Sequence, residues 1–127
     1  MKHVQKIKPF HIDERGEMSY LLPEDTKIVS SLFITSKKGS VRANHYHKKD
    51  THYCYVLKGK IEYSYINLNA KTKKKRTIIV NKGEVICTTP MILHAMKYLE
   101  DTEFLVLTTE KRDQKKYEKD TVRAKLV

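Results

Sequence analysis

The stretch from Gly39 to Gly59 decides the fold, and it reads GSVRANHYHKKDTHYCYVLKG. His45 and His47 stand two residues apart, so in a β-strand both side chains project from the same face. The polar residues after His47 predict a turn, and His52 would then begin the next antiparallel strand opposite that pair. The local sequence therefore predicts that three imidazoles lie close together.

A fourth histidine, His94, lies in a separate strand-like segment and could join this cluster across the fold. Imidazole nitrogen is a good ligand for zinc, iron, nickel, copper and cobalt. The spacing is also compatible with hydrogen-bonded or surface histidines that hold no metal. The hypothesis drawn from this pattern is a divalent transition metal (Zn, Fe, Ni, Cu or Co) bound by His45, His47, His52 and His94.

Length and composition predict one domain over residues 1–127. The chain has 127 residues, 39% of them hydrophobic, which is enough for one core. Short segments rich in β-branched and aromatic residues recur at intervals typical of an all-β sandwich or barrel. These segments are 28–34, 53–57, 60–68, 77–80, 85–88, 94–98 and 104–108. Residues 109–119 favour a helix but show almost no apolar stripe.

Charge and hydropathy limit the classes of partner. The formal net charge is +11, which favours an anionic small-molecule substrate through its positive field. The densest basic run, 71–76, lies between two strand-like segments and is interpreted as a hairpin tip, so nucleic acid is not the expected partner. The longest apolar run, 53–57, is far shorter than the roughly 20 residues of a membrane span. With no apolar stretch near residue 1, a cytoplasmic location is expected.

The segment 39–59 resembles the first cupin motif, G-x5-H-x-H-x3-4-E-x6-G, with His52 where the family has glutamate. The segment from Gly83 to His94 is similar to the second motif, with one extra residue before Pro90 and Tyr98 where asparagine is usual. The likeness covers about residues 28–108 and leaves a charged extension over 109–127. It implies a cupin-type double-sheet β-barrel (jelly roll) with a short C-terminal helix or tail, and histidines that face its interior.

Alternation along the strand makes this expectation specific. Counted from His52, Cys54 and Val56 should face inward, and the next residues outward in a row of Tyr53, Tyr55 and Leu57. Such an apolar outer row needs a cover. Because many cupins are dimers, a homodimer is expected.

A finer resemblance is to small bacterial cupins that act on nucleotide-linked sugars. Residues 42–48, RANHYHK, look like the R-G-x-H-x-H-K stretch of sugar-nucleotide ketoisomerases, and 13–17, DERGE, are similar to their D-x-R-G segment. Those enzymes use histidines as acids and bases without a required metal. The resemblance implies an isomerase or epimerase acting on a nucleotide-linked or related carbohydrate.

The chemistry of an isomerase or epimerase suggests a role for each candidate residue. Proton removal next to a carbonyl needs a base, and His45 or His47 would serve if no metal is bound. Tyr98 is then the candidate proton donor, while Arg42 and Lys48 are candidates for binding the anionic substrate. If a metal is bound, the histidines are no longer free bases, and the ion would polarise the carbonyl.

Two other functions stay open at this point. A metal-dependent oxygenase of a small molecule would need a redox metal with free coordination positions, which four histidines leave in an octahedral site. A non-catalytic cupin that binds or senses a ligand would show a bound metal or ligand without turnover.

Overall fold

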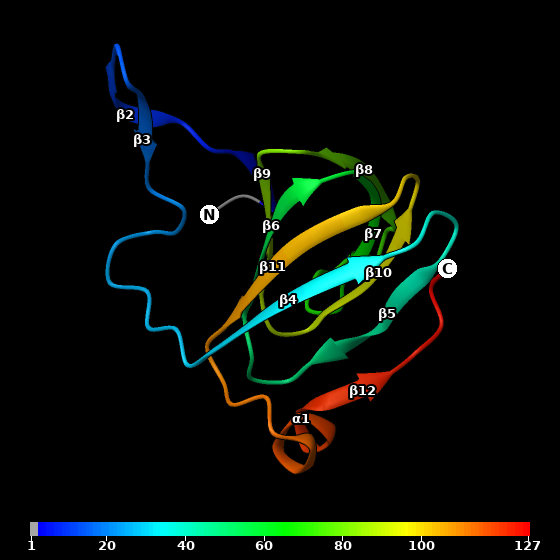
Figure 1. Cartoon of the computed structure of the whole chain (residues 1–127). Coiled ribbons are helices and arrows are strands. Elements are labelled where there is room, and N and C mark those ends of the chain that lie inside the picture. The colour runs from blue at the N-terminus through cyan, green and yellow to red at the C-terminus, as the bar shows by residue number, and fades with distance from the viewer. Residues whose placement is uncertain (1–2) are drawn as a thin grey trace.

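The computed structural model describes residues 3–127, in which two five-stranded antiparallel sheets face each other (Figure 1). The first sheet has the order β1-β9-β6-β11-β4, with bounds Val4–Lys6, Glu84–Thr88, His52–Lys58, Thr102–Thr108 and Ser30–Ser36. The second has the order β12-β5-β10-β7-β8, with bounds Thr121–Arg123, Val41–His47, Ile92–Tyr98, Lys60–Asn67 and Arg76–Asn81. The predicted all-β, double-sheet architecture is confirmed.

The core fills the space between the two sheets, and alternation along β6 follows the prediction. His52, Cys54 and Val56 are buried, while the residues between them are half-buried on the outer face. Large side chains from both sheets fill the core, because every second residue of each strand points inward. Its fully buried members include Ile61, Tyr63, Val80, Ile86, Tyr98 and Phe104.

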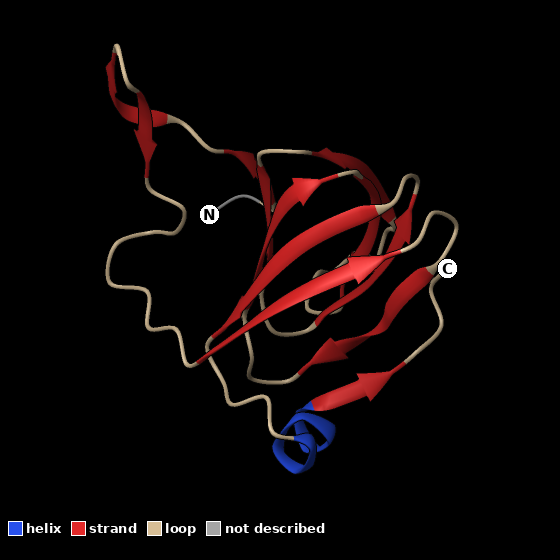
Figure 2. Cartoon of the chain, in the orientation of Figure 1, coloured by secondary structure: helices blue, strands red, loops and turns tan. Residues whose placement is uncertain are grey.

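Both sheets extend beyond the expected range 28–108. At one end β1 pairs with β9, and at the other β12 pairs with β5. The helix α1 (Gln114–Asp120) begins later than expected, because Asp113 caps it by accepting a hydrogen bond from the Lys116 amide at 3.2 Å. Figure 2 shows it as a short helix between β11 and β12.

The turns carry the remaining sequence signals. The basic run is the tip of the β7–β8 hairpin, as predicted. Gly59 joins β6 to β7 with φ of +97°, and a Cβ there would lie 2.6 Å from the Asp101 carbonyl oxygen. This motif position therefore needs glycine for both its conformation and the close approach. Within residues 3–127, no helix is long and apolar enough to cross a membrane.

A third, two-stranded element projects away from the sheets (Figure 1). It is the hairpin of β2 (Pro9–Asp13) and β3 (Gly16–Ser19). The DERGE segment forms its tip, where the Arg15 guanidinium binds the Asp13 carboxylate at 2.7 Å. The hairpin leaves large apolar side chains exposed, namely those of Phe10, Ile12 and Met18.

Candidate active site

Three of the four predicted histidines converge between the sheets. His45 and His47 come from β5 and His94 from β10, and one ring nitrogen of each lies within 4.8 Å of those of the other two. All three side chains are buried. The sequence separation of 47 residues between His47 and His94 is bridged because β5 and β10 are hydrogen-bonded neighbours, with His94 opposite His45.

A β-bulge sets which side chains of β5 enter the site. In the pairing with β10, His45 lies opposite His94 and Ala43 lies opposite Ala95, so Asn44 is an extra residue. Ala43 and Asn44 adopt φ of +72° and +54°. In a regular strand Arg42 and His45, three residues apart, would face opposite sides. The bulge allows both to line the same cavity.

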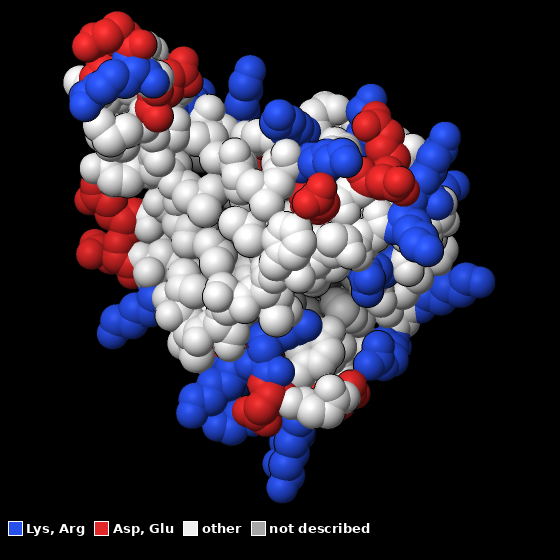
Figure 3. Space-filling view, viewed as in Figure 1, with Lys and Arg blue, Asp and Glu red and all other residues white. Residues whose placement is uncertain are grey.

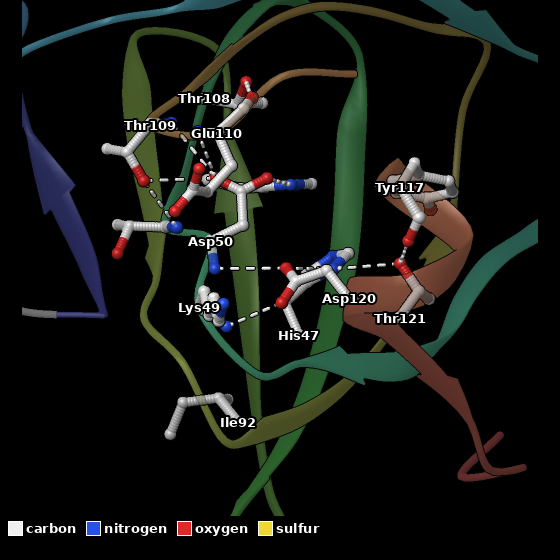
Figure 4. Close-up of polar contacts among 12 residues, drawn as sticks. His47, Lys49, Asp50, Ile92, Thr108, Thr109, Glu110, Tyr117, Asp120 and Thr121 are labelled. Carbon is white, nitrogen blue, oxygen red and sulfur yellow. Dashed lines mark hydrogen bonds and ion pairs between the residues drawn. The ribbon is translucent and has the colours of Figure 1, made fainter. Parts of the chain in front are cut away.

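Hydrogen bonds indicate which ring nitrogens carry protons. His94 Nδ1 lies 2.9 Å from the Ile92 carbonyl oxygen, which only accepts, so Nδ1 donates and Nε2 has the lone pair. The Thr121 hydroxyl donates to the Tyr117 carbonyl at 2.7 Å, so it accepts from His47 Nδ1 at 3.2 Å (Figure 4). His47 Nε2 then carries the lone pair of the ring. This nitrogen is buried without a hydrogen-bond partner, and so is His45 Nδ1.

These histidines are neutral at neutral pH. Burial lowers the pKa of His47 to about 2 and that of His45 to about 3, and the charges of neighbouring groups push in the same direction. Burial also lowers the pKa of His94 to about 4. The cluster therefore presents nitrogen lone pairs, which can accept a proton or bind a cation.

His52, predicted as the fourth metal ligand, lies beside this group but is held by a carboxylate. Its Nε2 is 2.7 Å from Asp50 Oδ2, and its ring centroid is 4.3 Å from that of His47. Burial opposes ionisation of Asp50, yet hydrogen bonds from His52 and Thr109 outweigh it and lower the pKa of the carboxyl. Among the described residues, the imidazoles whose nitrogens converge within 4.8 Å are therefore those of His45, His47 and His94, while His52 lines the cavity with its Nε2 on Asp50 and its role as a fourth ligand stays a prediction.

Two carboxylates fasten the loops around the cluster (Figure 4). Asp50 Oδ1 accepts from the Thr109 and Glu110 amides at 3.0 and 3.1 Å, which ties the β5–β6 turn to the segment after β11. Asp120 accepts from the Lys49 amide at 2.8 Å, which ties the same turn to α1, and one of its oxygens lies 3.8 Å from His47 Nδ1. The turn, the helix and the histidine are therefore positioned together.

His45, His52 and His94 form one wall of a cavity of about 310 Å³, and His47 packs against the rings of His45 and His52 without lining it. Arg42 stands at this cavity as predicted, with its Nε donating to Ser36 Oγ at 2.7 Å. Tyr98 lines it too, but four residues beyond His94 on β10, a rise of about 13 Å along the strand. Lys48 lines a different hollow, beside α1. The structure therefore does not bring Lys48 to the histidine cavity.

Sequence reasoning missed three residues of this cavity, and all come from the charged extension. Arg112, Tyr117 and Arg123 line it. The Tyr117 ring lies 5.7 Å from that of His47, and the Arg112 guanidinium stacks over it at 3.9 Å. The chain's positive charge was a general signal for such groups, but nothing local in residues 109–127 indicated that they fold back over the barrel.

We expect stability to depend on pH through His94. Its pKa is about 4 in the folded protein and 6.5 when unfolded, so between these values the unfolded chain binds more protons. The free energy of unfolding should thus be unaffected by this group above pH 6.5, and fall by about 3 kcal/mol as the pH drops to 4. Urea unfolding at several pH values measures this slope.

The variant His94→Gln should show a shallower slope over that interval, and His11→Gln, on the exposed hairpin, is the matched control. An unchanged slope in His94→Gln would contradict the assigned environment of His94.

Comparison with solved structures finds the same fold. A 3,4-ketoisomerase from Helicobacter canadensis matches with a TM-score of 0.75 and 17% identity over 94% of this chain and 88% of that one. QdtA, a sugar 3,4-ketoisomerase from Thermoanaerobacterium thermosaccharolyticum in complex with TDP, matches with 0.72 and 22% over 95% and 88%. A dTDP-4-dehydrorhamnose 3,5-epimerase from Sulfolobus tokodaii matches with 0.68 and 20% over 87% and 69%. The predicted cupin jelly roll is confirmed.

Sequence comparison gives one family and no individual relative. No curated protein matches the chain in sequence. The family model for the polysaccharide biosynthesis C-terminal domain matches residues 11–122. Because this match spans most of the 127 residues, the chain belongs to the polysaccharide biosynthesis C-terminal domain family.

Proposed function

We propose that this protein is an isomerase or epimerase that acts on a nucleotide-linked keto sugar. The observation that carries the proposal is a cluster of neutral, buried imidazoles at a cavity that is also lined by three arginines. The histidines supply proton transfer, and the arginines supply charge for a diphosphate. The similar solved structures support it, since they include a dTDP-4-dehydrorhamnose 3,5-epimerase and a sugar 3,4-ketoisomerase in complex with TDP.

His47 is the proposed base. Its Nε2 lone pair takes the proton from the carbon next to the carbonyl, and the electron pair of the broken C–H bond forms the enolate. The Nδ1–H stays on the Thr121 hydroxyl, and the Asp120 carboxylate 3.8 Å away stabilises the imidazolium. Burial makes His47 a weak base in the free protein, and a negatively charged substrate raises its proton affinity.

Return of the proton decides the product. Delivery to the opposite face of the same carbon inverts it, as in an epimerase. Delivery to the former carbonyl carbon moves the carbonyl, as in a ketoisomerase, when the hydroxyl proton of the deprotonated carbon passes to the former carbonyl oxygen. The sequence pattern indicated Tyr98 as the donor, but Tyr117 lines the cavity nearer to the histidines. We therefore assign Tyr117 as the first candidate donor, with Tyr98 at the remote end of the cavity.

The variant His47→Asn should lower kcat by about 10²–10⁴-fold, because it removes the base but keeps a side chain that can hydrogen-bond. The assay follows deuterium uptake from D₂O into the carbonyl carbon and the carbons next to it in TDP-4-keto-6-deoxyglucose, a sugar that a mutant of QdtA holds in one solved structure. It detects proton abstraction whatever the final product is.

Arg42→Ala should instead raise KM about tenfold with a smaller effect on kcat, since it removes charge from the binding step. His11→Asn is the control and should leave both constants unchanged. Deuterium uptake at the wild-type rate in His47→Asn would remove His47 from the mechanism.

A second candidate function uses the same cluster to hold a divalent transition metal, either Zn, Fe, Ni, Cu or Co. The unpartnered His45 Nδ1 and His47 Nε2 favour it, as does the His94 Nε2 that its Ile92 contact leaves free. Bound there, a metal would supply Lewis-acid polarisation of a carbonyl, or oxygen chemistry if it is redox-active. His47 could then not act as a free base, so the two functions exclude each other.

Elemental analysis of protein purified without chelator separates these functions. If the cluster binds metal, the wild type and His11→Ala carry close to one ion per chain, and His47→Ala and His94→Ala lose it. The isomerase proposal expects full deuterium uptake by metal-free wild-type protein. Activity that disappears with the metal and returns when it is restored would overturn the free-base mechanism.

We further propose that the protein is a homodimer through the outer face of the first sheet. This face carries half-buried or exposed apolar side chains on adjacent strands, and Figure 3 shows a broad uncharged surface over β4 and β11. They include Tyr53, Tyr55, Leu57, Leu105, Leu107 and Phe33, the last 57% exposed. A second copy is the simplest cover, since an isologous contact places the same patch on both sides.

Phe33→Lys should convert the dimer into a monomer in analytical ultracentrifugation, because it places a charge at the centre of a desolvated contact. Ile79→Lys, an exposed apolar position on the second sheet, is the matched control and should remain dimeric. A wild type that is monomeric at high concentration would rule out this interface.

A further inference from the structure

Residues 121–127, here called the strap, run along the open edge of the second sheet after α1. The first three form β12 and pair with β5, where Arg123 lies opposite His45. β12 has only three residues and one neighbour in the sheet, so its ladder provides little stability by itself. The rest of the strap needs another attachment to stay against β5.

Asn44 provides that attachment. Its Oδ1 accepts from the amides of Leu126 and Val127 at 2.8 and 2.9 Å, and its Nδ2 donates to the Val127 carbonyl at 3.0 Å. Its own carbonyl accepts from the Ala124 amide at 3.0 Å. One residue thus satisfies four main-chain groups of the strap.

The bulge makes this contact available. Asn44 is the extra residue of β5 and has no partner in β10, so its amide is free to bind the strap. Its φ of +54° lies in the left-handed region, which asparagine tolerates better than most residues. Few side chains offer both an acceptor and a donor at this length, and aspartate lacks the donor.

The strap matters for the site because it carries Arg123. This side chain lines the histidine cavity while remaining 64% exposed, and it also binds Glu118 of α1 at 3.0 Å. Its position next to the cluster is fixed by the strand pairing, in which it lies opposite His45. If the strap were flexible, the Arg123 guanidinium would occupy many positions instead of one.

We propose that Asn44 is a positioning residue whose side chain latches the strap to β5 and so holds Arg123 at the mouth of the histidine cavity to bind the diphosphate of the ligand. The ligand part of this inference rests on the proposed function. The latch itself is a property of the free protein and is tested without any ligand.

The experiment compares three single variants at the bulge and on the strap, together with the double variant of Asn44→Gly and Arg123→Ala. Asn44→Gly keeps the left-handed backbone but removes the latch. Asn44→Asp keeps the acceptor for two strap amides and is the conservative rescue. Arg123→Ala removes the positioned group and leaves the latch intact.

Hydrogen exchange measures the latch, and calorimetric titration measures affinity for TDP and for thymidine, which lacks the diphosphate. We expect the amides of Leu126 and Val127 to lose protection in Asn44→Gly and to keep it in Asn44→Asp. TDP affinity should fall about five- to tenfold in Asn44→Gly and in Arg123→Ala, with thymidine affinity unchanged. The double variant should bind TDP no more weakly than Arg123→Ala, because Asn44 acts through Arg123.

The measurements distinguish failure of the latch from failure of the proposed function. Unchanged exchange of the strap amides in Asn44→Gly overturns the latch whatever the ligand does. Faster exchange with unchanged TDP affinity shows that the strap is only structural, which overturns the inference and leaves the proposed function standing. A wild type that binds no TDP contradicts the proposed function, and with it the role assigned to Arg123, while the exchange result still decides the latch.

Discussion

The β-bulge at Ala43 and Asn44 is the constraint on which the rest of the site depends. Side chains of a regular β-strand point alternately to its two faces, so only every second residue can line a cavity on one face. The extra residue shifts that alternation once, between Arg42 and His45, so both of these side chains line one cavity. The same shift frees Asn44 from the sheet and lets it bind residues 124–127.

Desolvation then determines the chemical state of the cluster. Placing several imidazoles within a few ångströms of one another in a buried space is tolerable only if they stay neutral. Each neutral ring donates from one nitrogen and has a lone pair on the other. The fixed acceptors at Ile92 and Thr121 settle which nitrogen donates in His94 and His47. The cluster therefore holds buried nitrogen lone pairs that have no protein partner at His45 and His47.

Negative charge is kept at the border of this cluster. Asp50 lies in the turn between β5 and β6, and Asp120 is the last residue of α1. Main-chain amides donate most of the hydrogen bonds that these two carboxylates accept. They hold the β5–β6 turn against the residues that follow β11 and against α1. This arrangement leaves arginines as the charged side chains that line the cavity, which suits an anionic ligand.

The sequence alone determined the fold class, the inward and outward faces of β6, and the shared face of His45 and His47, whereas His94 joins them through the pairing of β10 with β5. Each of the first three features follows from local periodicity or from glycine and histidine spacing, which depend on neighbouring residues only. Tertiary structure decided that Asp50 holds His52, that Lys48 lies outside the cavity, and that the charged extension supplies Arg112, Tyr117 and Arg123. Asp50 and His52 are only two residues apart, but the contacts that hold Asp50 and the charged extension in place join residues about 60 to 80 positions apart. Local patterns do not specify which partner a hydrogen-bonding group will meet across the fold.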